Sequence, residues 1–244
     1  MKNFLKYILQ KTLGLNLYLY LFARFVILKL PYNKREKDFL KFIDLINDGD
    51  HVLDIGANIG AMTYYFSKKL PNSAIHSFEP IPENLKVLLR VKQKLKLLNV
   101  KTYSCAIGEK NGIIEMIMPE KSKVYFHGLS HVISNSEQKG RINSVEIKRL
   151  DDIKELNKVK VSAIKIDVEE YEYKVLMGAE RLIKKNKPII YCELWDSENR
   201  RKSTDFIKSL DYKICIHNGN KIIEYKDQKG FQNFFFIPVG NPAV

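Results

Sequence analysis

The segment from His51 to Leu70 constrains the fold of this chain more than any other. A short apolar run, 51–55, leads directly into the turn Gly56-Ala57-Asn58-Ile59-Gly60, and residues 62–70 can continue as a helix. Glycine adopts a positive φ without steric cost, and asparagine is among the few other residues that tolerate this region. The segment therefore predicts a strand, a tight turn and a helix, with a turn whose backbone can approach a small ligand closely.

The spacing of the two glycines indicates which ligand the turn would hold. A dinucleotide-binding turn has the pattern G-x-G-x-x-G, whereas Asn58 stands here at the middle glycine and an acid, Asp54, precedes the first one. Asp54 suits an ammonium group, and the N–H groups of the turn suit a carboxylate. S-adenosylmethionine carries both groups on its amino-acid end. Taken alone, Gly56 and Gly60 also fit a turn with a purely structural role.

A second strand-like segment, 73–78, ends in Glu79-Pro80. A carboxylate at the carboxyl end of a strand can accept hydrogen bonds from both hydroxyl groups of a ribose. We therefore predict that Glu79 holds the ribose of the cofactor, which favours the ligand-binding interpretation of the turn over the structural one.

Several further motifs follow in a fixed order. The chain contains Asp54-Ile55-Gly56-Ala57-Asn58-Ile59-Gly60, Phe78-Glu79-Pro80, Cys105-Ala106-Ile107-Gly108, Leu150-Asp151-Asp152 and Ile164-Lys165-Ile166-Asp167-Val168-Glu169. Together, over about residues 51–195, they resemble the FkbM family of S-adenosylmethionine-dependent methyltransferases. The resemblance implies an α/β, Rossmann-like sheet of seven strands, mostly parallel with an antiparallel closing strand. It also implies adenine near Ala106 and transfer of a methyl group to oxygen, commonly a hydroxyl of a sugar or natural product.

Length and patterning predict one catalytic domain with two additions. The 244 residues, 45% of them hydrophobic, suit a methyltransferase domain over 48–244 with a helical extension over 1–47. Residues 112–149 form short alternating segments, which predict a β-rich insertion. Such an insertion can cover the cofactor cleft and shape the substrate pocket.

Residues 1–32 are set apart by their composition. Leucines and aromatic residues crowd together, and every charged side chain is positive. Asn16 and Arg24 interrupt the apolar run, and a charge near the bilayer centre costs about 2.5–3.5 kcal/mol, which argues against a spanning helix. No small-x-small cleavage site follows, which argues against a signal peptide. We expect amphipathic helices that pack on the domain or lie on an anionic membrane surface, with packing on protein favoured.

Two carboxylates follow the predicted fourth strand, 159–166. Asp167 stands at the strand end, beside the expected cofactor sulfonium, so it or Glu169 can orient the acceptor hydroxyl or take its proton. Acids at a helix start are also stabilised by the helix dipole and need no other role. Glu193 ends the fifth strand and could share Mg²⁺ with Asp167, but two carboxylates from different strands are weak grounds for a metal site.

Two histidines in the predicted insertion, His127 and His131, are further candidates for contact with the acceptor. Lone histidines in a polar hairpin are also common as plain surface residues, so both interpretations stay open. Where the FkbM family usually has a glycine after Asp-Val-Glu, this chain has Glu170.

The leading hypothesis is a cytoplasmic O-methyltransferase that acts on a glycan, a lipid-linked sugar or a natural product. Its three cysteines lie in apolar runs without a C-x-x-C pair, as is typical of reduced core residues. The net charge of +13 motivates an RNA-directed methyltransferase as an alternative, although no Asn-Pro-Pro-Tyr motif occurs. Glu170 motivates a catalytically impaired cofactor-binding or scaffold protein. Neither a metal cofactor nor a nucleic-acid partner is favoured, and the sequence makes no prediction of oligomeric state.

Overall fold

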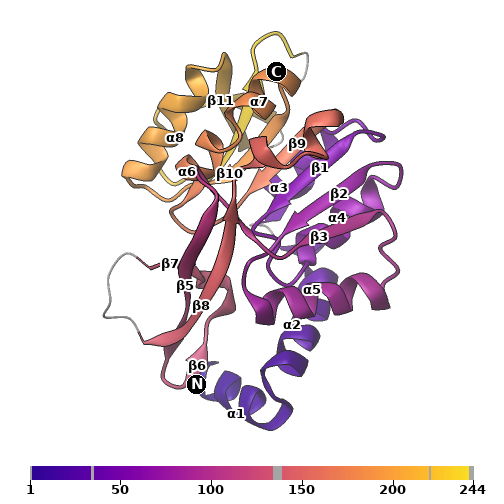
Figure 1. Ribbon diagram of the computed structural model, residues 1–244, viewed down its shortest axis with the longest axis vertical. Helices are drawn as coiled ribbons and strands as arrows, with labels where there is room; N and C mark the ends of the chain where they lie inside the picture. Colours follow the sequence, from indigo (N-terminus) through magenta and orange to yellow (C-terminus); the bar gives the residue numbers. More distant parts are fainter. Residues whose placement is uncertain (1, 34–35, 134–138, 220, 242–244) are drawn as a thin grey trace.

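A computed structural model describes residues 2–33, 36–133, 139–219 and 221–241 of the protein (Figure 1). Within these residues the main sheet has eight strands in the order β12-β11-β13-β10-β9-β1-β2-β3. The strands are β1 (His51–Ile55), β2 (Ala74–Phe78), β3 (Val100–Tyr103), β9 (Val161–Ile166), β10 (Ile189–Glu193), β11 (Tyr212–Asn218), β12 (Lys221–Glu224) and β13 (Asn233–Pro238). The five neighbouring strands β10, β9, β1, β2 and β3 are parallel to one another. Strand β13 pairs antiparallel with β10 and β11.

The predicted α/β, Rossmann-like architecture with an antiparallel closing strand is confirmed. The predicted count of seven strands misses β12, which forms a hairpin with β11 at the edge of the sheet. The sequence of β12, Lys-Ile-Ile-Glu, has only two apolar residues, so its pattern is too short to predict a strand without its partner.

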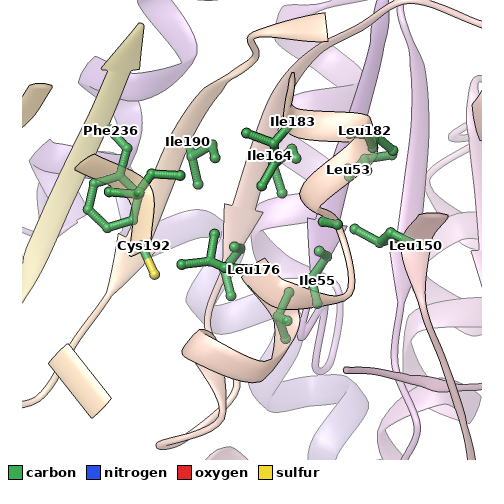
Figure 2. Packing of buried hydrophobic residues seen from close by; sticks show 14 of the residues in the cluster. Leu53, Ile55, Leu150, Ile164, Leu176, Leu182, Ile183, Ile190, Cys192 and Phe236 are labelled. Atoms are coloured by element: carbon green, nitrogen blue, oxygen red, sulfur yellow. The ribbon is translucent and has the colours of Figure 1, made fainter. Parts of the chain in front are cut away.

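Helices cover both faces of the main sheet. Leu53 and Ile55 of β1 point to one face, where Leu176, Leu182 and neighbouring residues pack on the sheet (Figure 2). This layer consists of α6 (Glu172–Met177), α7 (Glu180–Asn186) and α8 (Glu198–Lys208). The other face is covered by α2 (Leu15–Lys29), α3 (Lys37–Asp44), α4 (Ala61–Lys69) and α5 (Pro82–Lys94). Two covered faces explain why the central strands are mostly apolar.

The N-terminal helices are integrated into this architecture. Phe42 of α3 stacks on Tyr191 of β10 at 5.3 Å between ring centroids, so α3 is a covering helix of the sheet. The predicted domain boundary near residue 47 stays a prediction. One cluster of buried residues includes side chains from both sides of it. A further helix, α1 (Lys2–Leu13), precedes α2. No helix in the described ranges has both the length and the apolar character needed to cross a bilayer.

The segment predicted to be a β-rich insertion forms a second sheet. It contains β4 (Ala106–Ile107), β5 (Gly112–Lys121), β6 (Val124–Tyr125), β7 (His131–Val132) and β8 (Gly140–Lys148). The order is β4-β8-β5-β6, and β7 pairs with β5. Because β4 follows β3 after only two residues, the second sheet begins where the third parallel strand ends (Figure 1).

Asp151 explains the Leu-Asp-Asp motif structurally. Its buried carboxylate accepts hydrogen bonds from the backbone N–H groups of Arg181 (3.0 Å) and Leu182 (2.9 Å), at the start of α7. Its own N–H donates to the carbonyl oxygen of Gly178 (3.0 Å). Asp151 therefore ties the chain before β9 to the helices after it.

We expect Asp151→Ala to lower the free energy of unfolding by about 1–2 kcal/mol, because two N–H groups at a helix start lose their acceptor. Asp152→Ala is the matched control, since Asp152 pairs at the surface with Arg181 and should cost at most about 1 kcal/mol. Urea denaturation measures both values. Equal losses in the two variants would contradict the capping role of Asp151.

Candidate active site

The turn after β1 has the backbone that its glycines predict. Gly56, Asn58 and Gly60 have φ values of 75°, 50° and 85°. A Cβ atom on Gly56 would overlap the carbonyl oxygen of Asp167, so only glycine lets the ends of β1 and β9 approach this closely. The predicted strand, turn and helix are therefore confirmed as β1, the turn and α4.

A cavity lies at the carboxyl ends of β1, β2 and β9, where the second sheet faces the main sheet. Tertiary structure brings predicted site residues from five separate segments into its wall: Gly56, Asn58, Glu79, Ala106, His127, Asp167 and Glu169. Apolar side chains such as Met116 and Ile107 complete it. This main cavity combines one mostly apolar wall with a few convergent polar groups, as ligand sites commonly do.

Hydrogen bonds fix the side chain of Glu79 directly after the end of β2. Its carboxylate accepts hydrogen bonds from the N–H groups of Asn58 (2.8 Å) and Ile81 (2.9 Å) and from the amide of Asn84 (3.3 Å). The side chain is 4% exposed, and burial raises its pKa to about 7 despite these hydrogen bonds. A carboxylate offers about four acceptor positions, so the ionised group can still accept hydrogen bonds from a ligand.

His127 joins the second sheet to the turn. Its Nδ1 lies 2.9 Å from the amide oxygen of Asn58, and its carbonyl oxygen accepts a hydrogen bond from Asn84 (3.3 Å). Burial lowers its pKa to about 4, so the neutral ring donates from Nδ1 to Asn58. Its ring also packs edge-on against Phe22 of α2, with centroids 5.6 Å apart. His127 is therefore a wall residue and not a plain surface histidine.

A second cavity lies on the other side of the turn. Its wall includes Phe22 and Val26 from α2, Met62 at the start of α4, and Asp167. Gly56, Asn58, His127 and Asp167 line both cavities. The carboxylate of Asp167 suits an ammonium group and the N-terminal turn of α4 suits a carboxylate, so this cavity fits the amino-acid end of the predicted cofactor.

The structure corrects the predicted position of Asp54. Its carboxylate is fully buried and lines neither cavity. One oxygen accepts a hydrogen bond from the hydroxyl of Thr63 (2.6 Å), and the other lies 3.4 Å from the Nζ atom of Lys165. Asp54 therefore supports the turn from below, and Asp167 presents the carboxylate that faces the cavities.

Lys165 is a site residue that the sequence prediction missed. It is 2% exposed, and its Nζ donates to the carbonyl oxygen of Gly56 (2.8 Å) and lies 3.4 Å from both Asp54 and Asp167. Burial disfavours the charged ammonium, but the two carboxylates outweigh burial and raise its pKa. A lysine inside the apolar strand 161–166 was the available signal, because a buried charge needs a partner.

Two further predicted substrate residues lie outside the main cavity, and their contact with the acceptor stays a prediction. Glu193 ends β10 opposite Asn233 and lines neither the main nor the second cavity. His131 lies in β7 with its Nδ1 2.9 Å from the carbonyl oxygen of Leu129, and it lines a separate pocket beside Glu169. Within the described ranges, no three or more His, Cys, Asp or Glu side chains gather as a metal-binding group.

Glu170 does not obstruct the main cavity. Its φ of 66° is the left-handed conformation that glycine adopts most easily, which explains the glycine that the family usually has at this position. Its carboxylate accepts a hydrogen bond from the hydroxyl of Ser197 (2.8 Å) and so turns toward the start of α8. The position of Glu170 therefore gives no structural reason for an impaired site.

Comparison with known proteins agrees with this geometry. Residues 54–236 match the methyltransferase FkbM domain. The chain belongs to the FkbM methyltransferase family. This membership agrees with S-adenosylmethionine as the cofactor that the sequence predicts.

Individual relatives of this FkbM protein are distant. It is 28% identical over 148 residues to Methyltransferase 1 of Beauveria bassiana and 26% identical over 155 residues to Methyltransferase sdnD of Sordaria araneosa. These matches cover 54% and 53% of this chain, and they span 59% and 60% of the two relatives. A solved FkbM methyltransferase from Methylobacillus flagellatus KT superposes with a TM-score of 0.55 at 19% identity, covering 78% of this chain and 44% of that one.

Lys165 should be essential for the stability of this FkbM site. We expect Lys165→Met to lower the free energy of unfolding by about 3–5 kcal/mol, because it leaves Asp54 buried without a cation. Lys160→Met is the control: Lys160 pairs with Asp50 at the surface, so its loss should cost at most about 1 kcal/mol. Denaturant titration compares the two variants, and similar small losses would contradict a structural role for the buried cation.

Glu79 should make cofactor binding depend on pH. Its pKa of about 7 means that the carboxylate is mostly protonated at pH 6 and mostly ionised at pH 8. Because the ionised form can accept a hydrogen bond from a ribose hydroxyl at its remaining position, affinity for S-adenosylmethionine should rise by up to about tenfold over this range.

Calorimetric titration of the wild type, Glu79→Gln and Glu169→Gln at pH 6, 7 and 8 measures this dependence. Glu169 also has a pKa of about 7, so its variant is the matched control. The rise in affinity should vanish in Glu79→Gln and persist in Glu169→Gln. The reverse pattern would assign the pH dependence to Glu169.

Proposed function

We propose that this protein transfers the methyl group of S-adenosylmethionine to a hydroxyl of a glycan, a lipid-linked sugar or a natural product. The observation that carries the proposal is the pair of carboxylates after β9, Asp167 and Glu169, both of which line the main cavity. A hydroxyl group needs an acceptor for its proton when its oxygen is methylated, and a carboxylate in the wall supplies one.

The two carboxylates differ in their surroundings. Asp167 lies 3.4 Å from the ammonium of Lys165, which fixes its orientation. Glu169 is partly buried; burial and the charge of Asp167 raise its pKa to about 7, although the Trp195 side chain donates a hydrogen bond to it. A base with a pKa near the working pH is effective in general-base catalysis. We therefore assign proton acceptance to Glu169 and orientation of the acceptor and the cofactor ammonium to Asp167.

The remaining wall residues have binding roles in this proposal. Glu79 would hold the ribose, and the small side chain of Ala106, which lines the main cavity, leaves room for the adenine ring. When bound, the cofactor would supply an electrophilic methyl group to the hydroxyl oxygen and leave as S-adenosylhomocysteine. The hydroxyl proton passes to the carboxylate of Glu169. The second sheet, through residues such as Met116 and Val132, would shape the acceptor pocket.

Turnover of candidate acceptors tests this proposal. Purified protein is incubated with S-adenosylmethionine and a panel of sugars, lipid-linked sugars and hydroxylated natural products. Mass spectrometry then detects S-adenosylhomocysteine and a product heavier by one methyl group on oxygen. Turnover only on nitrogen, carbon or RNA would contradict the proposal.

With an acceptor found, we expect Glu169→Gln to lower kcat by about 10²–10⁴-fold, because the proton acceptor is lost. Its affinity for S-adenosylmethionine at pH 8 should change little. Glu170→Gln is the matched control, because its side chain faces Ser197 and it should keep the wild-type rate. A wild-type rate in Glu169→Gln would refute its role as the base.

A further inference from the structure

The outer face of α2 is apolar and uncovered. Leu17, Leu21, Phe25 and Leu28 recur every three or four residues along this helix, and they are between 36% and 67% exposed. In the preceding helix, Phe4, Leu5 and Ile8 are among the exposed apolar side chains. We call these seven residues the N-terminal apolar face. A stripe of exposed apolar side chains along a helix is typical of sites that contact a partner or a membrane.

The inner face of α2 is firmly packed, so the outer face is not exposed by a loosely held helix. Tyr18, Leu19, Ala23 and Ile27 are buried against the domain. The hydroxyl of Tyr65 in α4 also donates a hydrogen bond to the carbonyl oxygen of Ile27 (2.6 Å). The core therefore holds α2 in one orientation and leaves one stripe of its apolar side chains facing outward.

The surroundings of the apolar face are positively charged. No acidic residue precedes Glu36 in the chain. The guanidinium of Arg90 lies 4.1 Å from the ring centroid of Tyr20, which places α5 directly beside α2 (Figure 1). Lys86 and Lys94 are spaced one turn on either side of Arg90, and all three are exposed. An apolar stripe with basic residues along its side is the pattern of helices that lie in the interface of an anionic membrane.

We propose that the N-terminal apolar face docks on the surface of an anionic lipid bilayer, with α2 lying in the plane of the interface. The apolar side chains would enter the boundary between headgroups and acyl chains, and the basic residues would pair with lipid phosphates. A second copy of this chain is a poorer occupant, because two such faces would bring like charges together. The basic surroundings therefore favour anionic lipid.

Docking in this way would place the active site beside the membrane. Phe22 and Val26, on another side of α2, line the second cavity next to the cofactor turn. Within the proposed function, this arrangement favours a lipid-linked hydroxyl as the acceptor. That consequence rests on the proposed function, whereas the docking itself does not.

Vesicle sedimentation of the full chain tests the docking without any methyl transfer. We expect the protein to bind vesicles of phosphatidylglycerol mixed with phosphatidylcholine at least about tenfold more tightly than vesicles of phosphatidylcholine alone, and binding to weaken as salt rises. The variant Leu21→Ser/Phe25→Ser/Leu28→Ser should lose at least about tenfold in affinity. Its urea unfolding transition reports whether it is folded.

Leu98→Ser/Ile113→Ser is the matched control, since these apolar side chains are 92% and 75% exposed and belong to neither α1 nor α2. It should bind anionic vesicles like the wild type. The proposal is overturned if the wild type sediments with neither kind of vesicle, or if the triple variant binds as well as the wild type. It is also overturned if light scattering shows a wild-type dimer that becomes monomeric in the triple variant, which would make the face a self-interface.

Discussion

The structure of this protein depends on one buried cation, Lys165, between the ends of two parallel strands. The carboxylates of Asp54 and Asp167 approach each other there, and the ammonium of Lys165 lies 3.4 Å from both. Two such carboxylates would repel each other without it. The same ammonium binds the carbonyl oxygen of Gly56 (2.8 Å), so the pairing of β1 with β9 also fixes the cofactor turn. Charge compensation in the core thus determines the shape of the site.

Three acidic side chains around this turn have different roles because their surroundings differ. Asp54 is sealed beneath the turn, Asp167 faces both cavities, and Glu79 is fully buried but retains acceptor positions. Burial raises the pKa of Glu79 to about 7. The hydrogen bonds that its carboxylate accepts from backbone N–H groups limit this rise. Environment, rather than residue type, therefore separates a supporting carboxylate from those that meet a ligand.

Segments distant in sequence close the site from two sides. Through His127, the second sheet contacts Asn58 of the turn and Phe22 of α2. Gln10 of α1 exchanges two hydrogen bonds with the backbone of Tyr125, which ties the first helix to the same sheet. The N-terminal helices therefore pack against the elements that form the candidate site, and in our proposal their outer face would link the protein to a lipid surface. The expected packing on protein is seen on the inner face of α2. The expected contact with a membrane stays a proposal for its outer face.

The sequence by itself determined the strand, turn and helix around Gly56 and the order in which the motifs follow the parallel strands. It also determined that Glu79, Asp167 and Glu169 gather at one edge of the sheet. These features follow from local rules: alternation, turn chemistry, and the shared direction of parallel strands. Only the tertiary structure decided which side chains face the cavity. Strand register places Lys165 beside Asp54 and so turns Asp54 into a support. Packing over 69 residues of separation brings His127 to Asn58 and leaves His131 and Glu193 outside the main cavity. Such contacts depend on register and long-range packing, which no local pattern encodes.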